Sequence, residues 1–161
     1  MAIVQLAELA PLRAGPARLL GLDVGTKTVG LALSDTRLVI ATPMETIRRA
    51  KFQEDAARLA DIVRRQGVGG LVVGLPIGMD GRENPRSQSV RAFVRNLLAV
   101  IDLPAAMWDE RLSTAAVERA MIAADMTRSR RAEAIDRAAA AYILQGALDA
   151  LAHVQASAPE A

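Results

Sequence analysis

The pattern of apolar and polar positions divides the chain into short strands followed by helices. Three apolar runs come first, at residues 19–24, 29–33 and 38–41, with short turns between them. Short apolar runs bounded by glycine, aspartate or proline are typical of strands, and tight turns between them predict an antiparallel meander. The third strand is expected to stop at Pro43, because proline cannot donate a ladder hydrogen bond.

The pattern then changes to helical spacing. Apolar residues from Phe52 to Val63 predict a helix that ends at the glycines after residue 66. Leu71–Leu75 is apolar on both faces, which is typical of a central parallel strand. Asn84-Pro85 suits the start of the next helix, whose apolar stripe runs from Val90 to Ile101.

The last third of the chain predicts one more strand and two helices. Residues 105–108 form the strand, and Leu112-Ser113 then predicts a helix start stapled by Val117. Residues 125–131 are a polar connection, and residues 132–151 form a long, alanine-rich helix.

The order βββαβαβαα predicts an α/β fold, with a five-stranded mixed sheet in the order 3-2-1-4-5 and helices on both faces. The first strand is then central, and it ends where the strand order reverses, a place that favours ligand binding. We expect one domain over residues 18–152, a flexible lead-in over residues 1–17 and a frayed tail over residues 153–161.

Composition excludes several kinds of site. The 161 residues include no cysteine, which excludes disulfides, thiolate metal sites and a cysteine nucleophile. The net charge of +2 is too small to indicate nucleic-acid binding by itself. The sequence has no run of about 18 apolar residues, so no transmembrane helix and no membrane association are expected.

Asp23 is an acid within the apolar first strand. A buried carboxylate is costly unless a metal ion, a cation such as Lys27 or a protein donor compensates it. A structural aspartate that caps the next turn is the alternative. Gly21 and Gly25 flank Asp23 and let another backbone or a phosphate approach closely, which favours a functional carboxylate.

Two further acids are expected to reach the same place. Glu110, or its neighbour Asp109, follows the last strand, and Asp136 shares a helix face with small alanines that allow close packing on a sheet. With no cysteine and one histidine near the tail, carboxylate oxygens are the plausible metal ligands, and they suit Mg²⁺ or Mn²⁺. Gly74, which lacks a side chain, would leave room for Asp23 and Glu110 to converge above it.

Four segments together carry a family signature: Gly21–Lys27, Val72–Pro76 with Asp80-Gly81, Asp109–Thr114, and Ile135–Ala140 with Ile143–Gln145. In this order they resemble the YqgF (RuvX) family of proposed Holliday-junction resolvases and pre-16S rRNA processing nucleases. The resemblance implies an RNase H-like fold, phosphodiester hydrolysis dependent on Mg²⁺ or Mn²⁺, and a cytoplasmic protein. It also implies that Asp23, Glu110 and Asp136 are the metal-binding acids.

Basic residues gather in two clusters near the predicted site. The first lies around the loop before residue 85 and in the following helix, and the second precedes Asp136; they comprise Arg82, Arg86, Arg91 and Arg95, and Arg128, Arg130 and Arg131. Either cluster alone could be an ordinary solvated surface. Together they predict a basic rim that contacts phosphates, to which Thr26, Lys27 and Arg111 would add.

Two other functions stay open at this point. The Asp-x-Gly-Thr segment at residues 23–26 also resembles the phosphate loop of actin-like and sugar-kinase ATPases, although those enzymes need two such domains. A non-catalytic nucleic-acid-binding module is the third hypothesis. The sequence leaves open whether the substrate is RNA or branched DNA, whether a ribosome precursor is the partner, and whether the protein is a monomer or a homodimer.

Overall fold

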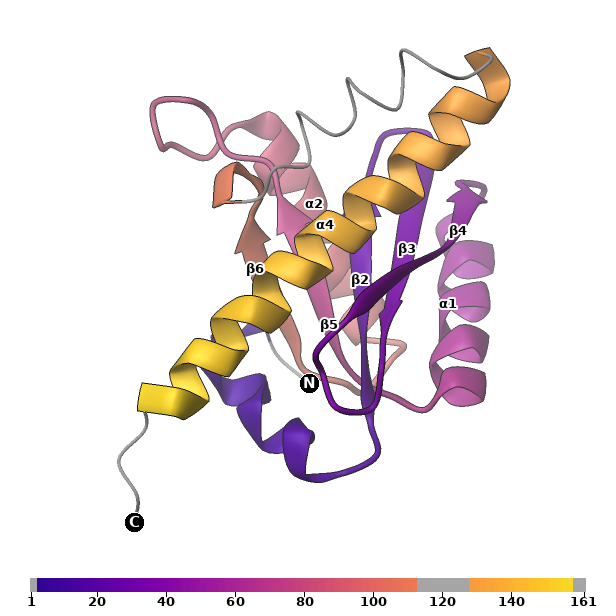
Figure 1. The fold of residues 1–161 in the computed structure, drawn as a ribbon. Helices are drawn as coiled ribbons and strands as arrows, with labels where there is room; N and C mark the ends of the chain where they lie inside the picture. Colours follow the sequence, from indigo (N-terminus) through magenta and orange to yellow (C-terminus); the bar gives the residue numbers. More distant parts are fainter. Residues whose placement is uncertain (1–2, 113–127, 158–161) are drawn as a thin grey trace.

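A computed structural model describes residues 3–112 and 128–157, with side chains of the last helix described from residue 135 to residue 154 (Figure 1). The predicted α/β class is confirmed by a mixed sheet in the order β1-β6-β5-β2-β3-β4. Its strands are β1 (Ile3–Val4), β2 (Arg18–Val24), β3 (Thr28–Ser34), β4 (Ala41–Arg48), β5 (Val68–Leu75) and β6 (Ala105–Asp109).

The sheet has six strands where five were predicted, so its order differs from the predicted one. The additional strand is β1, which pairs in parallel with β6 at the edge of the sheet. A strand of two residues is too short to show any alternation in the sequence. Strand β2 is central, as expected, with antiparallel β3 on one side and parallel β5 on the other.

The ends of the chain also depart from expectation. A flexible lead-in was expected over residues 1–17, but β1 is followed by the 3₁₀ helix η1 (Leu6–Ala14), whose Leu9 is completely buried. The last helix, α4 (Arg128–Ser157), includes residues 128–131 and 153–157, which were expected to be a connection and a frayed tail. The tail beyond Ser157 lies outside the described residues.

The predicted third strand is misplaced. Residues 38–40 belong to a turn in which Leu38 has a φ of 56°, and the Asp35 carboxylate accepts hydrogen bonds from the amides of Val39 and Ile40. Strand β4 begins at Ala41 and continues through Pro43. Proline is tolerated there because β4 is an edge strand and its register with β3 shifts near this point.

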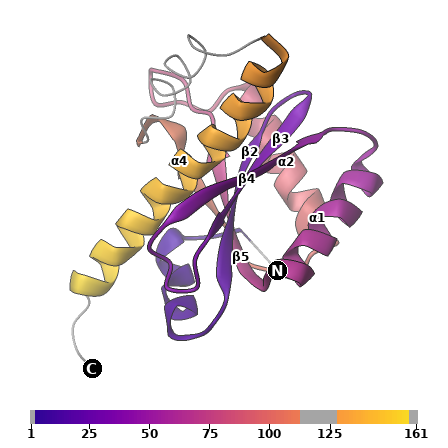
Figure 2. The same ribbon diagram turned by 45° about the vertical axis from the view of Figure 1, so that its right-hand side comes forward.

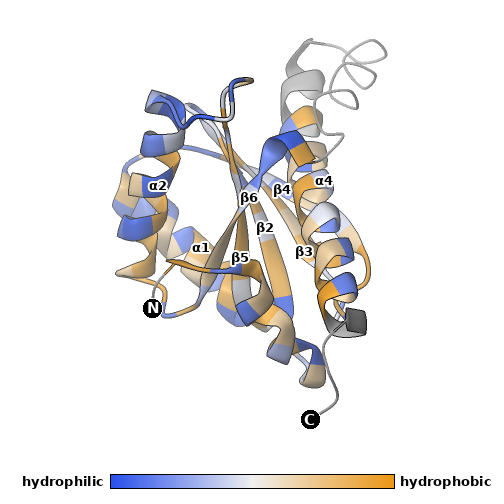
Figure 3. Ribbon diagram, turned by 90° about the vertical axis from the view of Figure 1, so that its left-hand side faces the viewer, coloured by the Kyte–Doolittle hydropathy of each residue, from blue (hydrophilic) through white to orange (hydrophobic). Residues whose placement is uncertain are grey.

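The first two helices agree with the sequence pattern. Helix α1 (Phe52–Gln66) ends at Gly67, whose φ of 64° suits glycine, and α2 (Pro85–Leu98) is capped by the Asn84 side chain. Helices α1 and α2 cover one face of the sheet and α4 crosses the other (Figures 2 and 3). Of the helix predicted from Leu112, residues 113–127 lie outside the described part, and Leu112 itself ends the 3₁₀ turn η2 (Glu110–Leu112).

Each strand divides its side chains between two cores. Leu20, Leu22 and Val24 of β2 pack with α1 and α2, whereas Leu19 packs with α4. A methyl group at Gly21 would lie 2.8 Å from the Cβ atom of Leu144 in α4. Because side chains alternate along a strand, Asp23 therefore lies on the α4 face. Within the described residues, the helices all lack the combination of length and apolar character that a membrane span requires.

Candidate active site

Asp23 lies near the end of β2, beside the hairpin turn. It pairs with Gly30 of β3, and the Gly25 amide donates to the Thr28 carbonyl oxygen at 2.8 Å, which closes the turn. Asp23 is partly buried, whereas Thr26 and Lys27 are exposed at the tip of the turn. The hairpin therefore presents a carboxylate on the α4 face and two polar side chains to solvent.

Helix α4 places Asp136 directly over this hairpin. A methyl group at Gly30 would lie 2.1 Å from the Asp136 carbonyl oxygen, so only a glycine lets the helix approach this closely. The Thr28 hydroxyl donates a hydrogen bond of 2.6 Å to Oδ2 of Asp136. Because Gly30 is the partner of Asp23 in the ladder, the main chain of Asp136 lies next to Asp23.

Glu110 reaches the same face from the other side. A methyl group at Gly74 would lie 2.9 Å from Oε1 of Glu110, so the carboxylate lies across the glycine, as the sequence led us to expect. Leu22 and Val73 are paired, so Gly74 is one step beyond them, at the level of Asp23 on the neighbouring strand. The two glycines thus permit acids from η2 and α4 to approach the end of β2.

Asp109 has a different environment from Glu110. The ring of Trp108 packs against Gly146 of α4, so by alternation Asp109 points to the opposite face of β6. Both of its carboxylate oxygens accept hydrogen bonds from Arg111, at 2.7 to 3.1 Å. The hydrogen bonds from Arg111 hold the pKa of Asp109 below its usual value. Asp109 is thereby engaged with Arg111 and directed away from the α4 face.

The acids do not form a closed metal cage in the structure. Among the described residues, no group of three or more histidine, aspartate or glutamate side chains is close enough together to hold a metal ion. The donor set nevertheless suits Mg²⁺ or Mn²⁺, because it consists of carboxylate oxygens. The Glu110 carboxylate lies above Gly74 and the main chain of Asp136 lies above Gly30, so both residues reach one end and one face of the sheet.

The predicted basic rim is only partly described. Arg82 lies in the exposed loop before α2, and Arg91 is paired with Glu83 at 2.5 Å. Arg86 donates to the carbonyl oxygen of Val24 at 3.1 Å, which places it at the end of β2. Arg128, Arg130 and Arg131 belong to the first turns of α4, but their side chains lie outside the described residues.

Two residues near the acids were missed by the sequence analysis. Thr28 holds Asp136, and Arg49 donates to the Gly25 carbonyl oxygen at 2.7 Å. Thr28 directly follows the turn. The correct register between β3 and β4, in which Thr28 pairs with Arg48, would have placed Arg49 beside the turn. The error in the start of the third strand concealed that register.

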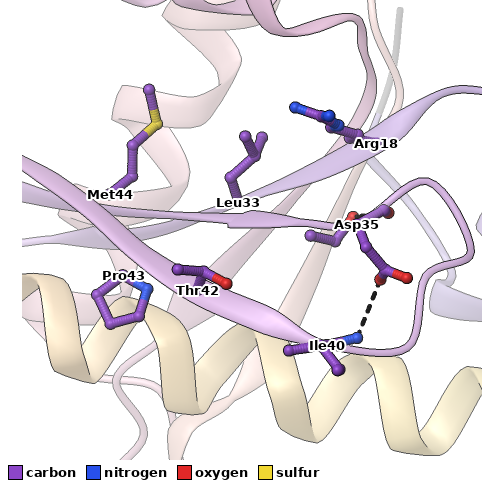
Figure 4. A pocket seen from close by; sticks show the side chains of 8 residues that line it. Arg18, Leu33, Asp35, Ile40, Thr42, Pro43 and Met44 are labelled. Atoms are coloured by element: carbon purple, nitrogen blue, oxygen red, sulfur yellow. Dashed lines mark hydrogen bonds between the residues drawn. The ribbon is translucent and has the colours of Figure 1, made fainter.

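A separate hollow lies at the other end of the sheet. It has a volume of about 400 Å³. Its lining includes Arg18 at the start of β2 and Asp35 after β3, with Ile40 beyond them (Figure 4). Because Arg18 and Asp23 are at opposite ends of β2, this pocket is distinct from the candidate active site.

Solved structures identify the class of fold. Thermus thermophilus RuvC in complex with a Holliday junction substrate aligns with a TM-score of 0.55 and 15% identity, over 88% of this chain and 98% of that chain. The yeast mitochondrial Holliday junction resolvase Ydc2 aligns with a TM-score of 0.52 and 12% identity, over 94% and 86%. The fold is therefore that of the RuvC-like, RNase H-like proteins.

Sequence relatives identify the family within that class. The family model described as "RuvX: Holliday junction resolvase" matches residues 17–150, so the chain belongs to the RuvX family. A Paramagnetospirillum magneticum protein is 59% identical over 149 residues, covering 92% of this chain and 96% of that protein. A Rhodospirillum rubrum protein is 62% identical over 133 residues, covering 82% and 83%. Both are named "Putative pre-16S rRNA nuclease". The resemblance seen in the sequence is confirmed, and it favours a nuclease over an ATPase.

Proposed function

We propose that this protein is a metal-dependent nuclease that hydrolyses phosphodiester bonds in structured nucleic acid. Asp23, Glu110 and Asp136 would hold the Mg²⁺ or Mn²⁺. The observation that carries this proposal is the pair of close approaches at Gly30 and Gly74, which bring acids from α4 and η2 to the end of β2.

Each residue of the proposed site has a separate role. A bound divalent ion would supply Lewis acidity and lower the pKa of a coordinated water. Asp23, on the central strand, is the most rigidly placed acid, because its strand is paired on both sides. The Thr28 hydroxyl donates to Oδ2 of Asp136 and fixes the orientation of that carboxylate. Asp109 orients Arg111 and is not assigned as a ligand.

The substrate class follows from the family and from the basic residues. We infer pre-16S rRNA 5′-end processing, Holliday junction resolution or both, in the cytoplasm, with a ribosome precursor as a partner in the first case. Phosphates would be contacted by residues of the turn, of η2 and of the two arginine clusters: Thr26, Lys27, Arg82, Arg86, Arg111, Arg128, Arg130 and Arg131. Junction resolution needs paired cuts and favours a homodimer, whereas RNA trimming is compatible with a monomer.

A non-catalytic nucleic-acid-binding module is the second candidate. It is favoured by one observation, that no three acids among the described residues are close enough to hold a metal. Under this hypothesis the fold binds nucleic acid without cutting it. Cleavage measurements separate the two candidates.

The decisive experiment is a cleavage panel of a four-way DNA junction, single-stranded DNA and single-stranded RNA, with Mg²⁺ and with Mn²⁺. Cleavage by the wild type should be abolished by a chelator and reduced at least about 100-fold by Asp23→Asn or Glu110→Gln. Glu54→Gln, an exposed acid on α1, is the matched control and should keep full activity. Circular dichroism checks folding. Binding without cleavage by the wild type would favour the second candidate, and full cleavage by Asp23→Asn would overturn the assignment of the site.

A further inference from the structure

Two guanidinium groups hold the main chain directly after Asp23. Arg86, in the first turn of α2, donates to the Val24 carbonyl oxygen at 3.1 Å, and Arg49, just after β4, donates to the Gly25 carbonyl oxygen at 2.7 Å. The two arginines are distant in sequence and come from different elements. Two cationic side chains therefore donate hydrogen bonds to consecutive carbonyl oxygens at the start of the hairpin turn.

Arg49 is held in place by more than this hydrogen bond. Its own amide donates to the Lys27 carbonyl oxygen at 2.9 Å, and its guanidinium lies 5.0 Å from the centroid of the Phe93 ring. Phe93 in turn meets Phe52 edge-on, with centroids 5.8 Å apart. Stacking on an aromatic ring fixes the plane of a guanidinium while leaving its edge donors available.

These two arginines differ from the other described arginines near acids. Arg58, Arg91 and Arg111 each pair with a carboxylate, and so do Arg64 and Arg65. In the described part of the chain, Arg49 and Arg86 instead contact main-chain carbonyl oxygens, and Arg49 also contacts an aromatic ring. A carbonyl group does not neutralise a guanidinium, and one hydrogen bond uses only part of its donor fork. Among the residues that the structure describes, these two guanidinium groups thus lie beside the turn without an ion pair to a carboxylate.

Their position relative to the acids is defined by the two faces of the sheet. Phe93 and the Val24 side chain belong to the core under α1 and α2, whereas Asp23 lies on the α4 face. The arginines therefore approach the hairpin turn from the face opposite to the acids. A nucleic-acid strand crossing the exposed turn would meet the acids on one side and the arginines on the other.

We propose that Arg49 and Arg86 form a phosphate-binding site for a backbone phosphate adjacent to the one that is attacked. The inference deepens the proposed nuclease function and rests on it. Planar guanidinium groups bind phosphate oxygens with paired hydrogen bonds, which a single point charge cannot reproduce. Because each arginine also holds the turn after Asp23, a phosphate bound there is fixed in register with the carboxylate.

The test measures binding separately from cleavage. A fluorescently labelled four-way DNA junction and a labelled single-stranded RNA are titrated with protein in the absence of divalent ions, at several salt concentrations. Arg49→Ala and Arg86→Ala should each weaken binding. Each should also make the fall of log affinity with log salt shallower, by about 0.9 in slope for the junction and about 0.7 for the single strand. Between 50 and 200 mM salt, the junction affinity of each variant should fall about 3.5-fold less than that of the wild type.

The controls separate charge from geometry and from folding. Arg58→Ala removes one cation that is already paired with Glu45, and it should leave the salt slope unchanged. Arg49→Lys keeps the charge but loses the fork, so the slope should persist while the KM for cleavage rises. If Arg49→Ala fails to fold, Arg86→Ala, at an exposed position, still tests the site.

Unchanged slopes in folded variants would overturn the phosphate site even if the wild type cuts. Reduced slopes with no cleavage by the wild type would support the site and reject the nuclease.

Discussion

The main chain of Asp136 rests on Gly30, since a methyl group on Gly30 would lie only 2.1 Å from the Asp136 carbonyl oxygen. Gly30 is also the ladder partner of Asp23. One residue without a side chain therefore joins the helix that carries one candidate acid to the hairpin that carries another. The nearest atoms are main-chain atoms, so neither element can yield by a simple rotamer change.

Gly30→Ala should consequently destabilise the protein strongly. Forcing a methyl group into a packed site usually costs 1–3 kcal/mol, and we expect about 3 kcal/mol here because α4 must shift as a whole. A loss of that size should lower the melting temperature by about 6–12 °C in a chain of this length. Gly15→Ala is the control, because no atom lies within 4 Å of its added methyl group. Equal melting temperatures for the two variants would show that α4 does not press on Gly30.

Gly74→Ala should impair activity more than stability. The added methyl group would meet Cδ1 of Ile143 at 2.5 Å and Oε1 of Glu110 at 2.9 Å, which are ends of flexible side chains that can move aside. The displaced Glu110 carboxylate should lower the cleavage rate, while unfolding by urea should shift by only about 1 kcal/mol.

The matched control for Gly74 is Gly70→Ala, on the same face of β5. Its methyl group would meet the side chains of Leu19, Leu12 and Leu9 at 3.0 to 3.3 Å, far from the acids. We expect a similar loss of stability and normal cleavage. If the two variants cleave equally well at a temperature where both are folded, Glu110 does not need the gap above Gly74.

Much of this architecture could be predicted because it is local in the sequence. The glycine after α1, the Asn84 cap and the apolar run of β5 each carry their signal within a few residues. The lack of a side chain at Gly74 also predicted where Glu110 could cross. Such features depend on the size and the local conformational preference of single residues, which can be judged from the sequence.

The missed features depend on contacts that the pattern of apolar residues does not show. Leu38–Ile40 reads as a strand, and only the side chain of Asp35, by capping the amides of Val39 and Ile40, makes it a turn. The hydrogen bond between Thr28 and Asp136 spans 108 residues and exists only once α4 has docked. A strand of two residues, like β1, is created by its partner β6 rather than by its own pattern.

Thr28→Val tests the support of Asp136 without changing the shape of the residue much. Oδ2 of Asp136 loses the hydroxyl that donates to it at 2.6 Å. A partner that orients a metal-binding carboxylate is typically worth about 10–100-fold in metal affinity or activity, and we expect the Mn²⁺ dependence of cleavage to move to higher concentration by about tenfold. Thr28→Ser keeps the hydroxyl and should retain the wild-type curve. Coincident curves for the valine and serine variants would separate Thr28 from the metal site.

Asp109→Asn should leave cleavage at pH 7 largely intact, in contrast to Glu110→Gln, because Asp109 is engaged with Arg111 on the other face of β6. The substitution should instead lower the stability of the folded protein. The hydrogen bonds from Arg111 lower the pKa of Asp109 in the folded protein, so its contribution to stability is complete above the unfolded value of about 3.9 and is lost as the pH falls through the lower, folded value. The wild type should therefore unfold at a higher urea concentration than Asp109→Asn at pH 6, and the gap should close as the pH falls below about 4. Because the side chains of Asp109 and Arg111 are 20% and 44% exposed, added salt should also narrow the gap at pH 6. A gap that is independent of pH, together with loss of cleavage in Asp109→Asn, would instead assign Asp109 to the metal site.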